Sequence, residues 1–118
     1  MRKGWPSFAL ERLAMLKKWK KYAEIVAKAC RELYGSKCLE VYVVGGVAEG
    51  RLTVLSDIDL VVIVGDSKMK TLNTVLAIKR RAEELGVPLD IPLDIKVMLK
   101  NEFEEKLGKL YRKAVRVL

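Results

Sequence analysis

The most constraining segment of the sequence is an apolar run that opens with two aspartates, Ser56-Asp57-Ile58-Asp59-Leu60-Val61-Val62-Ile63-Val64. Its second half, Leu60–Val64, is apolar on both faces of a strand, which is typical of a strand buried in the middle of a sheet. Side chains alternate along a strand, so Asp57 and Asp59 point to the same face. Adjacent carboxylates repel each other, and a divalent cation would remove that repulsion. The segment therefore predicts a central strand, Asp57–Val64, with a metal site at its start.

Apolar residues at helical spacing predict three longer helices. These cover Ser7 to about Tyr34, about Lys68 to Leu85, and Phe103 to Leu118. Ser7 can cap the first helix, and Gly35 and Gly86 are expected to end the first and second. Leu33 and Leu72 are expected on the buried faces of these two helices.

Two further strands are expected, Cys38–Val44 before the aspartates and Leu89–Leu99 after them. Pro92 indicates that the first half of the later strand lies at an edge or a bulge. A short helical turn is expected from Val47. The order α-β-α-β-α-β-α indicates an α/β (α+β) fold, in which helices pack on a small mixed sheet. With 118 residues, the chain is expected to form one domain, residues 1–118.

Composition excludes several classes of site. The chain has no histidine, which excludes a Ser-His-Asp triad, a Cys-His pair and most zinc sites. Cys30 and Cys38 are expected to be two small buried thiols. A disulfide between them is the alternative, because abundant Lys, Arg and Glu resemble the composition of a hyperthermophile, in which intracellular disulfides occur.

No apolar stretch is long enough to span a bilayer, and Met1–Pro6 leads into a charged helix rather than the apolar core of a signal peptide. We therefore expect a cytoplasmic protein that has no membrane partner.

The net charge of +8 is spread unevenly along the chain. Residues 1–34 contain nine basic and three acidic residues, whereas residues 35–65 contain two basic and four acidic residues. The densest basic cluster is Lys17-Lys18-Trp19-Lys20-Lys21. We expect the solvated face of a helix there, with Trp19 on the buried side. Nucleic-acid binding by these lysines is the alternative.

A second motif, Gly45-Gly46-Val47-Ala48-Glu49-Gly50, follows the first expected strand. It matches neither the dinucleotide fingerprint G-x-G-x-x-G nor a P-loop. Two glycines between a strand and a helical turn still leave backbone N–H groups free, and such groups bind phosphate. Together with the aspartates, the motif predicts a site for a metal–triphosphate complex.

The combined pattern Gly45-Gly46-x-Ala48-x-Gly50-x5-Ser56-Asp57-x-Asp59-Leu60 resembles the signature of the polymerase-β-like nucleotidyltransferase superfamily. Length and element order are similar to its minimal form, the MNT domain. The resemblance covers about Cys38 to Leu99 and implies the polymerase-β-like nucleotidyltransferase fold.

The resemblance also implies a third carboxylate on the strand after Asp57 and Asp59. Asp90 and Asp94 both lie there and share a strand face. We expect Asp94, because an uninterrupted strand-like run follows it, whereas Asp90 has Pro92 beside it. The three carboxylates would hold two Mg²⁺ ions, with Mn²⁺ as an alternative, and Asp94 would help to deprotonate the acceptor hydroxyl.

The remaining implied contacts involve the nucleotide's phosphates, which Gly45, Gly46 and Ser56 are expected to bind. The family commonly has serine where Gly46 stands, so one hydroxyl contact is missing. Many minimal members carry arginine where Glu49 stands. A carboxylate there weakens nucleotide binding unless it points to solvent or pairs with Arg51.

The implied activity is metal-dependent transfer of a nucleoside monophosphate, AMP from ATP, to a hydroxyl with release of pyrophosphate. The implied acceptor is a tyrosine or other hydroxyl of a helical HEPN-type toxin, and a homodimer is a further possible assembly. One alternative is a weakly active or inactive antitoxin subunit that binds its toxin through an apolar helix face. The other is a basic nucleic-acid-binding protein.

Overall fold

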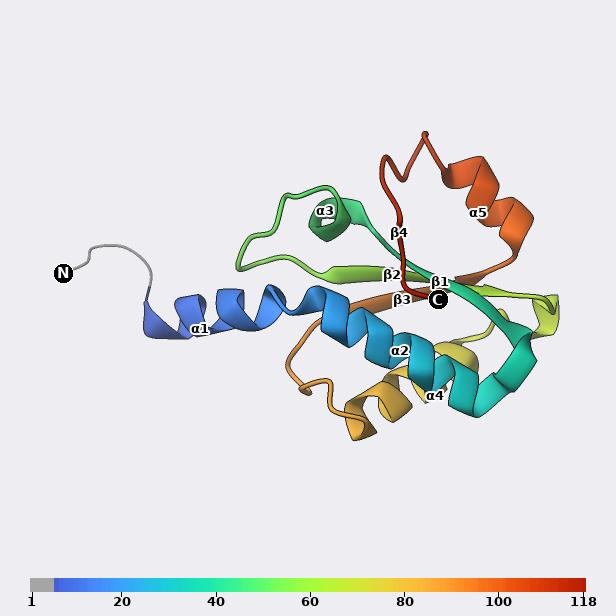
Figure 1. Cartoon of the computed structure of the whole chain (residues 1–118), viewed down its shortest axis with the longest axis horizontal. Coiled ribbons are helices and arrows are strands. Elements are labelled where there is room, and N and C mark those ends of the chain that lie inside the picture. The colour runs from blue at the N-terminus through green and yellow to red at the C-terminus, as the bar shows by residue number, and fades with distance from the viewer. Residues whose placement is uncertain (1–5) are drawn as a thin grey trace.

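The computed structural model describes residues 6–118. The first five residues, on which the expectation about a signal peptide partly rests, lie outside the described residues. The fold is a four-stranded mixed sheet with helices on both faces (Figure 1). The predicted α/β class with a small mixed sheet is confirmed, but only three of the four strands were predicted. The helices are α1 (Ser7–Leu16), α2 (Trp19–Tyr34), α3 (Gly45–Ala48), α4 (Leu72–Glu84) and α5 (Lys100–Lys106), with single 3₁₀ turns at Gly35–Lys37 and Ser67–Met69. The strands are β1 (Cys38–Val44), β2 (Ile58–Val64), β3 (Leu93–Met98) and β4 (Val115–Arg116).

The strands are ordered β3-β2-β1-β4 across the sheet. β1 is antiparallel to both β2 and β4, whereas β2 and β3 run parallel. The prediction of a central aspartate strand is confirmed, because β2 has a partner on each side and its residues Leu60–Val64 are at most 1% exposed.

Each face of the sheet has its own apolar cluster. The larger one joins the sheet to α2 and α4, and includes Val26, Leu60 and Ile78. The smaller one lies on the opposite face, where Val61 and Phe103 pack together under α5. Figure 1 shows α2 and α4 on one side of the sheet and α3 and α5 on the other. The register of β3 against β2 is specified by the alternation along β3, where Leu93 and Ile95 pack in the larger cluster and Asp94 and Lys96 face away from it.

The predicted first helix is divided in two, because the chain leaves helical geometry at Lys18 (φ −87°, ψ 18°). The two parts pack on different structures. The Nε group of Arg12 on α1 donates a hydrogen bond to the Val54 carbonyl in the loop before β2, at 2.8 Å, whereas α2 packs on the sheet. Ser7 is the first helical residue and makes no cap, since Pro6 precedes the helix. Leu33 was wrongly predicted to be buried and is 42% exposed.

The lysines around Trp19 lie on an exposed face, while Trp19 packs partly buried against the larger apolar cluster. The prediction of a solvated helix face is confirmed. Among the described residues, no helix is long and apolar enough to cross a bilayer.

The second predicted helix starts later than expected. Thr71 caps α4 by accepting a hydrogen bond from the Thr74 N–H group at 3.2 Å. The cap places Leu72 in the first turn, which faces solvent, so the prediction that Leu72 is buried is wrong.

The C-terminal helix was also predicted to be longer than it is. α5 ends at Lys106, Gly108 adopts φ +82°, and Val115–Arg116 return as β4 beside β1. This strand covers an edge of β1 that would otherwise have unpaired backbone groups. Likewise, β3 begins only at Leu93, because residues 88–91 form a turn in which Ile91 N–H donates to the Pro88 carbonyl at 3.1 Å.

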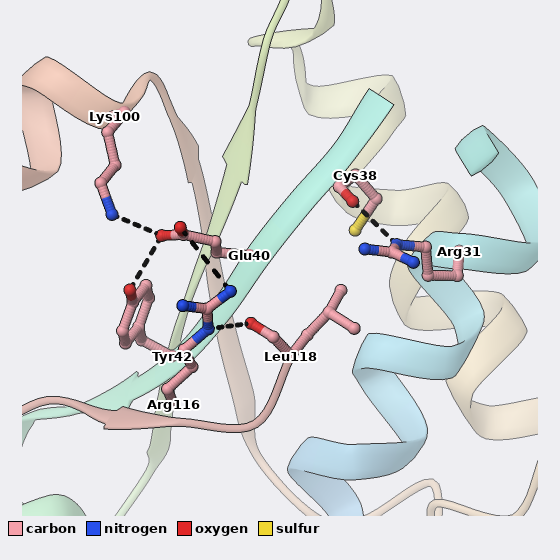
Figure 2. A network of polar contacts seen from close by, with 7 residues as sticks. All are labelled: Arg31, Cys38, Glu40, Tyr42, Lys100, Arg116 and Leu118. Atoms are coloured by element: carbon pink, nitrogen blue, oxygen red, sulfur yellow. Dashed lines mark hydrogen bonds and ion pairs between the residues drawn. The ribbon is translucent and has the colours of Figure 1, made fainter. Parts of the chain in front are cut away.

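A polar network fastens β4 and α5 to β1 (Figure 2). Lys100 Nζ lies 2.6 Å from Glu40 Oε1, which also accepts a hydrogen bond from the Tyr42 hydroxyl at 2.8 Å. Arg116 Nη2 on β4 lies 3.8 Å from Glu40 Oε2. Beneath this network the ring of Tyr42 stacks on Phe103, with 4.5 Å between centroids. The hydrogen bond from Lys100 holds the pKa of Glu40 below its ordinary value.

A disulfide between Cys30 and Cys38 joins the end of α2 to the start of β1, with the Cα atoms 5.9 Å apart. The prediction of two free thiols is therefore wrong, and the alternative holds. The neighbouring Arg31 strengthens the same junction, because its Nε group donates to the Cys38 carbonyl at 2.9 Å (Figure 2).

The disulfide is expected to stabilise the fold. For cysteines eight residues apart, the loss of chain entropy in the unfolded state corresponds to about 2.5 kcal/mol. Urea unfolding with reductant should therefore give a lower free energy of unfolding than unfolding without it. A Cys30→Ala/Cys38→Ala variant should show no response to reductant. Equal stability of the wild-type protein under both conditions would contradict the prediction.

Glu40 should contribute to the stability in acid. A depressed folded-state pKa gives stabilisation that is present above the unfolded pKa, about 4.3, and is lost as the pH falls through the folded pKa. We expect wild-type stability to fall more steeply than that of Glu40→Gln between about pH 5 and pH 3. Urea unfolding at several pH values measures this, with Glu104→Gln on the exposed face of α5 as control. Parallel curves for the wild type and Glu40→Gln would refute it.

Candidate functional site

The aspartates gather at the end of the sheet where β1 finishes and β2 and β3 begin. Asp59 is the second residue of β2 and Asp94 the second residue of β3, and the parallel register pairs them directly. Paired residues on adjacent strands point to the same face. Asp57 precedes β2 and is exposed. The structure thus brings Asp94 beside Asp59, whereas Asp90 lies in the turn before β3.

The electrostatics of Asp59 reflect its crowded position. Partial burial raises the pKa of the Asp59 carboxyl above its ordinary value, and the nearby Asp94 carboxylate adds to the rise. Asp57 also raises the pKa of Asp59, by less than Asp94 does, whereas the positive charge of Lys96 lowers it. Placing these carboxylates together therefore carries the electrostatic cost that the sequence predicted.

Lys96 lies within this acidic group and was not predicted from the sequence. Its Nζ atom is 3.0 Å from Asp94 Oδ2, and this hydrogen bond raises the pKa of Lys96. Strand alternation provides the signal that could have identified it, because residues two apart share a face.

Gly45 packs directly against Asp59. It follows Val44, which pairs with Asp59 across the sheet, and it adopts φ +75°. A Cβ atom at Gly45 would overlap Asp59 Oδ2 and lie 3.2 Å from its Cγ. At Gly46, by contrast, the nearest atom to an added Cβ would be Arg51 Nη1 at 3.7 Å. Gly45 thus leaves room for the carboxylate, and both glycines place N–H groups at the start of α3, where helices lack internal partners.

Glu49 and Ser56 both take part in local contacts. Glu49 Oε1 lies 2.7 Å from Arg51 Nη2, and the hydrogen bond from Arg51 lowers the pKa of Glu49. This pairing with Arg51 is the condition, expected from the sequence, for nucleotide binding beside Glu49. Ser56 Oγ accepts a hydrogen bond from the Thr53 N–H group at 2.8 Å. Ser56 therefore shapes the loop that leads to Asp57.

A pocket of about 240 Å³ adjoins the acidic group. Gly45, Asp59 and Lys96 line its polar side, and Leu110 and Tyr111 form an apolar wall. The two wall residues come from the segment after α5, which the sequence placed in a helix. Because this segment was predicted to be helical, the contact of Leu110 and Tyr111 with the site was not expected from the sequence.

The donor chemistry of the site suits Mg²⁺ or Mn²⁺, which prefer carboxylate oxygens. Among residues 6–118, no three acidic or cysteine side chains form a ready-made metal cluster as they stand. Asp59 and Asp94 are nevertheless adjacent, and their mutual repulsion is the cost that a bound cation would relieve. The residues present therefore fit a divalent cation.

Comparisons with known proteins identify the family and the fold. A family model described as "Nucleotidyltransferase domain" matches residues 23–117. The fold is similar to a 1.40 Å crystal structure of a Sulfolobus solfataricus protein assigned as a nucleotidyltransferase, with a TM-score of 0.61 and 20% identity. That similarity covers 98% of this chain and 89% of the other. No curated protein matches the sequence.

Gly45 and Gly46 should respond differently to the same substitution. Gly45→Ala adds strain at a positive φ and a clash with Asp59, so it should lower the free energy of unfolding by roughly 1–3 kcal/mol. Gly46→Ala adds the same methyl group at ordinary van der Waals distance from Arg51 and should stay within about 0.5 kcal/mol of the wild type. Urea unfolding of the two variants measures the difference. Equal effects would show that Asp59 does not depend on the missing side chain at Gly45.

Proposed function

The chain belongs to the nucleotidyltransferase domain family of the polymerase-β-like superfamily, and on that premise we propose that it transfers AMP from ATP to a hydroxyl acceptor, with release of pyrophosphate. The observation that supports the proposal most strongly is the direct pairing of Asp59 with Asp94 next to Gly45. This pairing places two carboxylates beside backbone donors suited to phosphate.

Each group has a definite part in the proposed reaction. Asp57, Asp59 and Asp94 would hold two Mg²⁺ ions, which when bound stabilise the attacking and leaving oxygens. Asp94 accepts the proton of the acceptor hydroxyl. The N–H groups of Gly45 and Gly46 orient the β- and γ-phosphates. The hydroxyl oxygen then bonds to the α-phosphorus as the bond from that phosphorus to the pyrophosphate oxygen breaks.

The acceptor hydroxyl is proposed to belong to another protein, with a tyrosine of a HEPN-type toxin as the candidate. The Asp94 side chain is 48% exposed, and Asp57 is exposed as well, so a hydroxyl on a large partner can reach them.

A protein-binding role, as in an antitoxin subunit, is the second candidate. It is favoured by apolar side chains that project near α1, since Phe8 is 71%, Leu55 86% and Leu89 80% exposed. Arg12 on α1 bonds to both loops that carry these leucines, at Val54 and Asp90. Exposed apolar groups of this kind mark contact surfaces in many proteins.

Aspartate-to-asparagine variants test the enzymatic proposal. Asn keeps the shape of Asp but removes the charge that a cation needs, so Asp57→Asn, Asp59→Asn and Asp94→Asn should each lower Mg²⁺-dependent pyrophosphate release from ATP by about 100-fold or more. Asp90→Asn is the matched control, because Asp90 lies outside the paired strands, and it should keep wild-type activity. A wild-type rate in Asp59→Asn and Asp94→Asn would exclude the proposed site.

A further inference from the structure

Lys96 is placed so that its ammonium group serves the acidic site rather than the fold. Its ion pair with Asp94 joins residues two apart on one strand, so it connects no two elements of the structure. The Lys100–Glu40 pair, in contrast, spans 60 residues and fastens α5 to β1. Removing the Lys96 charge should therefore disturb the site while leaving the tertiary contacts in place.

The position of Lys96 matches that of a counter-ion. It lies on the same sheet face as Asp94 and Asp59, and it lines the pocket beside Gly45. In the protein without other cations, its charge offsets the repulsion between the two carboxylates, which is the direction in which it acts on Asp59. The Lys96 side chain is 53% exposed, so its ion pair is screened by water and can exchange readily.

We propose that Lys96 is an internal counter-ion that competes with the divalent cation for Asp94 and, once displaced, contacts the phosphates of the nucleotide in the adjoining pocket. This inference rests on the proposed function. It has a consequence for binding order, because a cation that displaces the ammonium group from Asp94 frees it for the phosphates. Cation and nucleotide then bind with positive coupling through one side chain.

Mn²⁺ titration without nucleotide, followed by the electron paramagnetic resonance signal of free Mn²⁺, tests the competition. Lys96→Met keeps the unbranched stem of the side chain without its ammonium group, and should bind Mn²⁺ about fivefold more tightly than the wild type, the upper range for a half-exposed ion pair. Lys96→Arg keeps the charge and should resemble the wild type. Lys106→Met is the matched control, since Lys106 and Lys96 line the same neighbouring groove. It should change the affinity less than twofold, because among the described residues Asp94 pairs with Lys96 and not with Lys106, so only a solvent-screened charge is lost.

The binding of ATP in the presence of Mn²⁺ provides the second measurement. Lys96→Met should bind Mn²⁺–ATP more weakly than the wild type, although it binds Mn²⁺ alone more tightly. These opposite signs, absent in Lys106→Met, are the signature of the exchange. Circular dichroism and thermal melting establish that each variant is folded.

The outcomes separate this inference from the proposed function. Tighter Mn²⁺ binding in Lys96→Met than in Lys106→Met supports the inference. Equal affinities in the wild type and Lys96→Met, or equal changes in the two methionine variants, would overturn the inference and leave the proposed metal site standing. A lack of Mn²⁺ binding by both the wild type and Lys96→Met would overturn the metal site itself, and the inference with it.

Discussion

The parallel pairing of β2 with β3 is the contact on which the rest of the structure depends. It places Asp94 level with Asp59, and these two are the acidic residues of the paired strands. The register is fixed because β3 alternates, with Leu93 and Ile95 in the apolar cluster of α2 and α4 and Asp94 and Lys96 on the opposite face. A slip of one residue would turn Asp94 toward the apolar cluster of α2 and α4, where an unpaired carboxylate is costly. The stability of the sheet and the geometry of the site therefore have the same origin.

The site carries an electrostatic cost that the surrounding residues limit without removing. Gly45 has no side chain where Asp59 needs space, and Lys96 supplies a positive charge two residues after Asp94. Arg51 similarly pairs with the carboxylate of Glu49. Such compensation is typical of functional sites, where charges are held together for chemistry rather than for stability.

The sequence predicted the centre of the fold better than its ends. β1 matches its predicted bounds, and β2 differs by one residue, because continuous apolar runs bounded by glycine or polar residues have few alternative structures. The structure places Asp94, and not Asp90, beside Asp59, because the strand begins only after Pro92. The break at Lys18 was missed, since apolar spacing continues across it.

The other misses depended on contacts between distant segments. β4 has only two residues and forms because β1 offers a free edge for pairing. The helical spacing of apolar residues around Leu110 led to the prediction of a helix there instead. The disulfide required Cα atoms 5.9 Å apart, a distance that sequence spacing does not give.

Binding of ATP at the paired aspartates can be tested directly by paramagnetic broadening of amide NMR signals with Mn²⁺ and a non-hydrolysable ATP analogue. The signals of Gly45, Asp59 and Asp94 should disappear first, whereas those of the exposed helix around Lys20 should persist. Broadening centred on the lysines instead would contradict nucleotide binding at this site.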